Sequence, residues 1–134
     1  MTITDPGQMN TVELLALQID EEAKYAKEPY FIDVVNAILT SLSELHYSAF
    51  GEEPTIENLA TYIRQEPDQW ASTVKLFEEI AKKTVDPQSK QRIETALDLE
   101  RGNNAYIRNM RDFPGIQITS MEVLRRIVER QRAA

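Results

Sequence analysis

The chain has 134 residues, 42% of them apolar and 28% charged, a balance typical of one folded domain rather than of a disordered chain. It contains no cysteine, which excludes disulfides, thiolate metal sites and cysteine nucleophiles. No apolar run approaches the ~20 residues that a membrane span needs, and the first eight residues lack the pattern of a signal peptide. We therefore expect a cytoplasmic protein without membrane contact.

The charge is unevenly distributed along the chain. Residues 1–100 carry 19 acidic and 8 basic side chains, a balance of −11, whereas residues 101–134 carry 7 arginines and 3 acidic side chains, a balance of +4. An acidic body followed by an arginine-rich end indicates that this end meets something negative. The partner could be the acidic body of a second copy, another protein or a nucleic acid.

Residues 1–9 contain a turn sequence and are expected to form a loose N-terminal arm. An apolar stripe at helical spacing predicts a first helix over about 11–27, which Pro29 ends. A second helix is predicted over about 30–49, with Gly51 after it in the left-handed conformation. The second helix is apolar on nearly all sides, so we place it at the centre of a bundle.

The middle of the chain carries repeated signals for helix starts. Thr55 is expected to cap a short helix. Pro67 and Pro87 each open a further helix, because proline is well tolerated in a first turn. The Gly-Asn-Asn sequence at 102–104 predicts a kink or break before a short helical segment over 105–111.

The sequence Phe-Pro-Gly at 113–115 is the strongest predicted break in the chain. Residues 116–118 alternate between apolar and polar side chains and are expected to be extended, and Thr119 with Glu122 resembles a capping box for a last helix. The break would allow residues 116–134 to act as a detachable C-terminal segment.

Together these elements predict an all-α protein in which residues 1–134 form a single compact bundle of five to seven helices, with a C-terminal helix after the Phe-Pro-Gly break. The apolar stripes predict a shared core. Its members are expected to be Val35, Ile38, Leu42, Val74 and Phe77.

No catalytic, metal or cofactor motif is evident. His46 is the only histidine, and Glu44, two residues away, would point to another side of a helix, so we expect no metal role and a local hydrogen bond for His46. Glu94 and Asp98 lie one turn apart but lack the facing pattern of a carboxylate metal site. Trp70, the only tryptophan, is expected in the core, with an interface anchor as the alternative.

The arginines near the C-terminus are the best candidates for partner binding, because arginine pairs in a planar, bidentate way with carboxylates and phosphates. The candidate residues are Arg108, Arg111, Arg125, Arg126, Arg130 and Arg132. Some of these charges have a simpler explanation, since Glu122 with Arg126 and Arg125 with Glu129 are helix pairs four residues apart.

The sequence favours a non-enzymatic protein-interaction module, such as an adaptor, assembly factor or inhibitor, that acts through its acidic body and arginine-rich last helix. It would bind a protein partner or a second copy, as a homodimer in which residues 116–134 pack across the other chain. A nucleic-acid-associated factor that contacts phosphates is the alternative, which an acidic protein disfavours. A small metal-dependent hydrolase with an unusual carboxylate site is the third reading.

Overall fold

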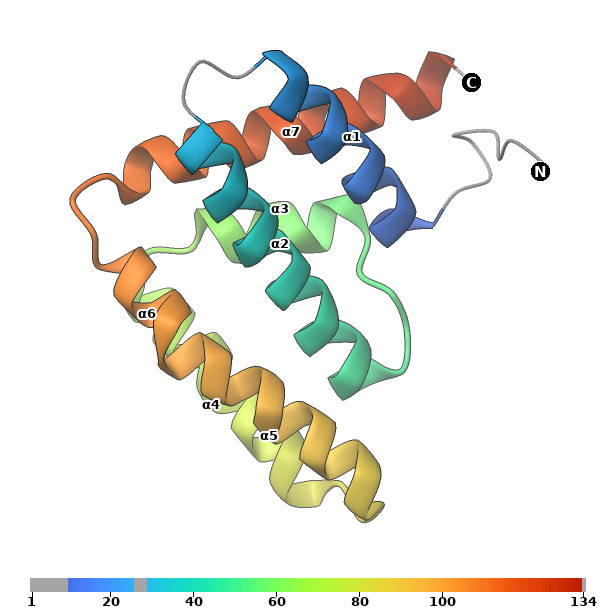
Figure 1. Cartoon of the computed structure of the whole chain (residues 1–134). Helices are drawn as coiled ribbons and strands as arrows, with labels where there is room; N and C mark the ends of the chain where they lie inside the picture. Colours follow the sequence, from blue (N-terminus) through green and yellow to red (C-terminus); the bar gives the residue numbers. More distant parts are fainter. Residues whose placement is uncertain (1–9, 26–28, 134) are drawn as a thin grey trace.

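The computed structural model describes residues 10–25 and 29–133, and these residues form helices and no strand, which confirms the all-α class. The described part of the chain contains seven helices in one bundle (Figure 1). They are α1 (Thr11–Tyr25), α2 (Pro29–Phe50), α3 (Ile56–Arg64), α4 (Pro67–Lys83), α5 (Pro87–Arg101), α6 (Asn103–Arg108) and α7 (Phe113–Ala133). The predicted arm over 1–9 and the predicted end of the first helix at Lys27 lie outside the described residues.

The central position predicted for α2 is confirmed. This helix contacts α1, α3, α4, α5 and α7, and its Val35 and Leu39 are fully buried. The main core around it draws side chains from six of the seven helices in the described part of the chain. It contains Leu14, Leu15, Ile19, Ile32, Val35, Ile38, Leu39, Leu42, Leu59, Ile63, Trp70, Ile107, Phe113, Ile116, Val123, Leu124 and Ile127.

A second, smaller core lies where the α4–α5 hairpin packs on the end of α2. The hairpin extends away from α1 and α7 (Figure 1). This core contains Leu45, Phe77, Ala81, Ile93, Ala96 and Leu97. The prediction of one shared core is therefore wrong for Phe77, which belongs to the second cluster, whereas Val74 is partly buried and contacts both clusters.

Several helix ends follow the predicted signals. The Oγ1 of Thr55 caps α3 by accepting a hydrogen bond from the backbone N–H of Asn58 at 3.0 Å. Pro67 and Pro87 occupy the first positions of α4 and α5, where a helix has no use for an N–H group. Gly51 has a φ of 71°, so it ends α2 in the left-handed conformation that glycine adopts without strain.

The predicted break at 113–115 is wrong. These residues form the first turn of α7, and residues 116–118 are helical rather than extended. Two N–H groups of this turn donate to the carbonyl oxygen of Asp112 at 3.0 and 3.2 Å. A proline can stand in the first turn of a helix, because the N–H that it lacks would have no partner there. The turn between α6 and α7 therefore lies before the proline, over 109–112.

The predicted capping box at Thr119 and Glu122 is also wrong, because both residues lie inside α7. The Oγ1 of Thr119 donates to the carbonyl oxygen of Gly115 at 3.0 Å, the usual bond of a threonine within a helix. A C-terminal helix is present as predicted, but it begins at Phe113 and is continuous to Ala133.

In the single chain, α7 packs on α1, α2 and α3. Its Ile116, Val123, Leu124 and Ile127 are at most 2% exposed. The apolar stripe of the last helix is therefore covered by its own bundle. Detachment of residues 116–134 and their exchange with a second copy stay predictions, and either would have to uncover these four side chains.

Over residues 10–25 and 29–133, no helix combines the length and the apolar character needed to cross a membrane.

Candidate functional site

The six candidate arginines do not form one patch. Arg108 ends α6 and Arg111 lies in the turn before α7, whereas the other four lie in the second half of α7. At the helical rise of about 1.5 Å per residue, roughly 20 Å of α7 separates the two groups. The molecule therefore carries two cationic regions, one at each end of α7.

Two of the arginines in α7 are paired with carboxylates of the same chain. Arg125 binds Glu122 at 2.7 Å and also contacts Glu129, and its hydrogen bond holds the pKa of Glu122 below the ordinary value. Arg126 contacts Glu22 of α1 and lies 3.7 Å from Glu122. Exposed pairs of this kind contribute little stability, but they reduce the charge that these two side chains offer to a partner.

Arg130 and Arg132 differ from their neighbours in the last turns of α7. Neither makes an ion pair with any residue in the described ranges 10–25 and 29–133. Arg132 is exposed and Arg130 half-buried. Their charges lie at the C-terminal end of a helix, where the helix dipole also favours cations.

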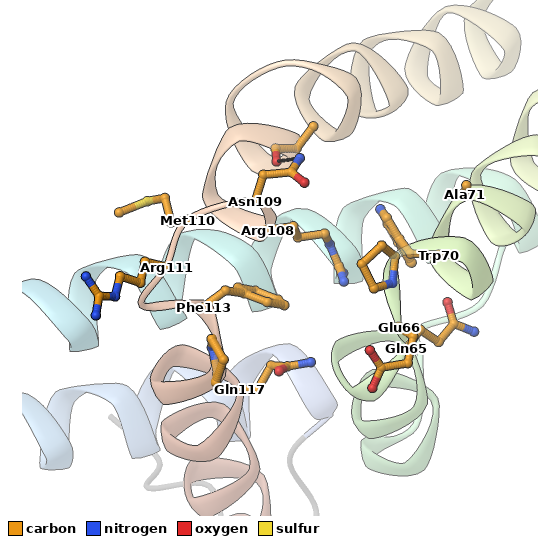
Figure 2. Close-up of a pocket in the computed structure, with 13 residues that line it drawn as sticks. Gln65, Glu66, Trp70, Ala71, Arg108, Asn109, Met110, Arg111, Phe113 and Gln117 are labelled. Atoms are coloured by element: carbon orange, nitrogen blue, oxygen red, sulfur yellow. Dashed lines mark hydrogen bonds between the residues drawn. The ribbon is translucent and has the colours of Figure 1, made fainter.

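Arg108 lies in the wall of a cavity of about 390 Å³ between the start of α4, the end of α6 and the start of α7. Its guanidinium carbon is 3.8 Å from the ring centroid of Trp70 and 5.5 Å from that of Phe113. Figure 2 shows Arg108 pointing toward Trp70, while Arg111 and Met110 point the other way. The predicted pair of Arg108 and Arg111 thus shares one cavity, but only Arg108 points into it.

The guanidinium of Arg108 has few hydrogen-bond partners. Its Nη2 donates to the carbonyl oxygen of Tyr62 at 3.4 Å, whereas the buried Nε and Nη1 have no partner among the described residues. Burial lowers the pKa of Arg108 to about 10, and the carboxyl of Glu100 opposes this effect. The side chain therefore stays charged at neutral pH while most of its five N–H donors are unused.

Glu100 belongs to a buried polar network between α5, α6 and α2. Its Oε1 accepts hydrogen bonds from Ser41 Oγ at 2.8 Å and from Asn104 Nδ2 at 2.9 Å, and Asn104 Nδ2 also donates to Ser41 Oγ at 2.9 Å. Glu100 and Asn104 are 2% exposed, and Glu100 Oε2 has no partner among the described residues. Burial raises the pKa of Glu100, against the effect of these hydrogen bonds.

Two glutamine side chains line the same cavity and each has one end engaged. Gln65 accepts a hydrogen bond from Thr73 Oγ1 at 2.8 Å through its Oε1. Gln117 donates from its Nε2 to the carbonyl oxygen of Ile63 at 2.9 Å. The amide N–H₂ of Gln65 and the amide oxygen of Gln117 make no hydrogen bond to another side chain or backbone group in the described ranges.

Sequence reasoning missed Glu100 and Asn104, which join Arg108 at a spacing of four residues. The predicted break at 102–104 hid this stripe, although α5 and α6 continue on one path after the kink at Gly102 (Figure 1). The signal that could have identified Glu100 and Asn104 is their position, because they continue the apolar inner face of α5 at helical spacing. Trp70 was expected in the core, and it is 7% exposed there while it also lines the cavity.

Two of the metal candidates considered from the sequence, His46 and Asp98, have other partners. His46 is 9% exposed, and its Nδ1 is 2.6 Å from the hydroxyl of Tyr62, a hydrogen bond to α3 rather than to its own helix. Burial lowers the pKa of His46. Arg101 pairs with Glu78 at 3.3 Å and with Asp98 at 3.0 Å. No group of three or more histidine and carboxylate side chains in the described part of the chain is arranged to hold a metal ion.

A comparison of the chain with family models, curated proteins and solved structures finds no match.

Proposed function

We propose that this protein is a non-enzymatic protein-interaction module that binds an acidic group of a partner protein in the cavity beside Arg108. The observation that carries this proposal is the state of the Arg108 side chain. It is charged, it stacks on Trp70, and it lies in the wall of a cavity that also offers apolar surface.

An anion from a partner would offset the positive charge that Arg108 keeps although burial disfavours it. Hydrogen bonds to a charged group are roughly twice as strong as those between neutral groups, so a partner's carboxylate suits this side chain. Tryptophan and arginine are also the residues that most often dominate the binding energy of protein interfaces, and Phe113 adds a second apolar wall.

The remaining arginines fit a supporting role. Arg111 lines the cavity without pointing into it, and Arg130 and Arg132 lie at the far end of α7. Cations at the rim of a binding surface change the rate at which an acidic partner arrives more than they change the final affinity. The alternative of a nucleic-acid-associated factor has to overcome the net charge of −7, which repels phosphates.

Selection from a library of random peptides displayed on phage tests the proposal. We expect the intact chain to enrich peptides that combine a carboxylate with an apolar residue, and Arg108→Gln to abolish the enrichment. Arg92→Gln is the matched control, because Arg92 is exposed and the substitution changes the net charge equally. Equal enrichment by both variants would refute the proposal, and steeply salt-dependent binding of random-sequence DNA would favour the alternative function.

Self-association is a second form of the same proposal. Arg130 and Arg132 make no ion pair within residues 10–25 and 29–133, and the rest of the chain is acidic, so the end of α7 could bind the acidic body of a second copy. A chain ending at Gly115 is unsuitable as a test, since it would remove the buried Ile116. Sedimentation of the intact chain and of a chain with Arg130→Glu and Arg132→Glu is suitable. A homodimer lost in the double variant would support this form, and a monomeric intact chain would refute it.

A further inference from the structure

We infer that copies of this chain associate through two complementary surfaces: the tip of the α4–α5 hairpin of one copy sits in a groove between α1 and α2 of the next. The inference goes beyond the proposed function, because neither surface includes the cavity beside Arg108 or the arginines at the end of α7. It is carried by the apolar surface and the charge that the groove and the tip present.

The groove has a volume of about 410 Å³ and lies between α1, α2 and the segment that follows α2. Val12 and Tyr47 supply apolar walls, and Tyr47 is 45% exposed in the single chain. Glu44 and Glu53 line the groove as well, and none of the lining side chains is basic. The surrounding sequence adds to this charge, since residues 29–63 carry five acidic side chains and no lysine or arginine. The groove therefore suits an apolar group that is flanked by cations.

The hairpin tip, which we define as residues 82–90, presents such a group. Val85 is 93% exposed, more than any other large apolar side chain in the described part of the chain. Both of its neighbours are bonded to helix ends. Thr84 Oγ1 donates to a carbonyl oxygen of α4 at 2.7 Å, and the carboxylate of Asp86 accepts from a backbone N–H in the first turn of α5 at 2.9 Å. These bonds fix the backbone on either side of Val85 and keep its side chain in a defined, solvent-facing position.

The tip is also a cationic part of an acidic protein. It contains three lysines, Lys82, Lys83 and Lys90. Lys82 pairs with Glu79 at 3.3 Å, whereas the other two make no ion pair within residues 10–25 and 29–133. Asp86 is the only acidic side chain of the tip, and its carboxylate caps α5. Opposite charges on two surfaces direct their approach and fix the register of the contact.

The tip that enters the groove belongs to another copy. The side chains that line the groove come from α1, α2 and the segment after α2, and none comes from the hairpin. The hairpin also extends away from α1 (Figure 1). A contact between two different surfaces is heterologous, so the assembly closes into a ring or grows into a chain. Because a contact of this size is weak, a covalent trap is the suitable way to detect it.

The lack of cysteine in the chain makes such a trap specific, since only introduced thiols can react. A Val85→Cys variant is mixed with a Tyr47→Cys variant that carries a size tag, under air with a copper–phenanthroline oxidant. Non-reducing gel electrophoresis then gives the rate at which the disulfide-linked heterodimer forms. In the matched control, Ile118→Cys replaces Tyr47→Cys, because Ile118 is an exposed apolar residue outside the groove. A disulfide requires the two Cα atoms to lie within about 7 Å of each other.

We expect the tip and groove thiols to link about tenfold faster than the control pair, since the contact raises the effective concentration of one thiol at the other. Lys83→Glu with Lys90→Glu in the tip chain should lower the rate to that of the control. Glu44→Lys in the groove chain should restore part of it, because the two charges are then complementary again. Equal rates for the two pairs, or a rate that the reversed tip charges do not change, would overturn the inference.

A further variant separates this contact from self-association through α7. Arg130→Glu with Arg132→Glu in both chains should leave the rate of the tip and groove pair unchanged. If this double variant abolishes the linkage and the reversed tip charges do not, the inference is wrong and the copies bind through the end of α7. Selection of peptides with Arg108→Gln tests the cavity beside Arg108 separately, so either proposal can fail while the other stands.

Discussion

The two isoleucines at the start of α7 allow a sharp test of how the last helix packs. In an extended segment, Ile116 and Ile118 would point to the same side. In a helix they point about 200° apart, and the structure buries Ile116 completely while Ile118 is 66% exposed. We predict that Ile116→Ala strongly destabilises the protein, whereas Ile118→Ala hardly affects it.

The expected size of the effect follows from the burial. Replacing a buried isoleucine by alanine removes three carbon atoms, at about 0.8 kcal/mol each. A residual cavity of roughly 50 Å³ adds about 1.2 kcal/mol at about 24 cal/mol per Å³. The sum for Ile116→Ala is between about 3 and 4 kcal/mol. For Ile118→Ala we expect a change below about 0.5 kcal/mol, since little surface is buried there and alanine is the better helix former.

Equilibrium unfolding in urea, followed by circular dichroism at the helical band, measures both free energies of unfolding. Both variants should keep the slope of the transition, so that a shift in midpoint reports stability alone. A loss below about 1 kcal/mol for Ile116→Ala, or equal losses for the two variants, would refute the packing of α7 described here. It would then favour the detachable segment expected from the sequence.

Three further predictions follow from local features. Because the pKa of Glu100 is raised in the folded protein, this carboxyl keeps its proton to a higher pH there than in the unfolded chain. The free energy of unfolding should therefore fall as the pH rises above about 4.5, and Glu100→Gln should remove this fall in urea melts taken across the pH range. Gly51→Ala should cost about 1–2 kcal/mol of stability, because alanine is strained at the positive φ of this position. Gly115→Ala should stabilise the protein by up to about 1 kcal/mol, because a Cβ there meets nothing closer than 3.8 Å. Stabilisation by the first variant, or destabilisation by the second, would contradict the backbone described. Neither EDTA nor Mg²⁺ with ATP should shift the melting temperature, and a shift in either case would indicate a metal or nucleotide site.

Helix starts could be predicted from the sequence where a single local signal decides them. Pro67 and Pro87 were interpreted correctly because an acidic residue precedes each proline and an amphipathic stripe follows. At Pro114 the same rule applied, but the glycine after it led to the prediction of a break. Here the burial of Phe113 and Ile116 outweighs the cost of the glycine between them, and tertiary packing of this kind is not visible in a local pattern.

The candidate site was only partly predictable for a similar reason. Arg108 was identified by its charge, but the sequence could not show that Trp70 and Phe113 flank it, because these residues are far apart along the chain and meet only through the packing of α4, α6 and α7. The pairing of Arg126 with Glu22 likewise depends on the contact between α1 and α7. Charge counts along a sequence therefore overestimate the free positive charge of the last helix.

The division of the apolar interior into two clusters has a consequence for hydrogen exchange. The α4–α5 hairpin packs on α2 mainly through the small cluster, although Trp70 at the start of α4 belongs to the main core. Among the partly buried residues that the structure describes, Val74 and Tyr62 contact both clusters. Segments held by separate clusters open as separate cooperative units. The amide protons of the hairpin should therefore exchange through a partial opening, at lower free energy than those of α2 and α7. An opening that extends to Trp70, at the start of α4, would move one wall of the cavity away from Arg108. A bound partner should therefore slow the exchange of those hairpin amides that open together with Trp70.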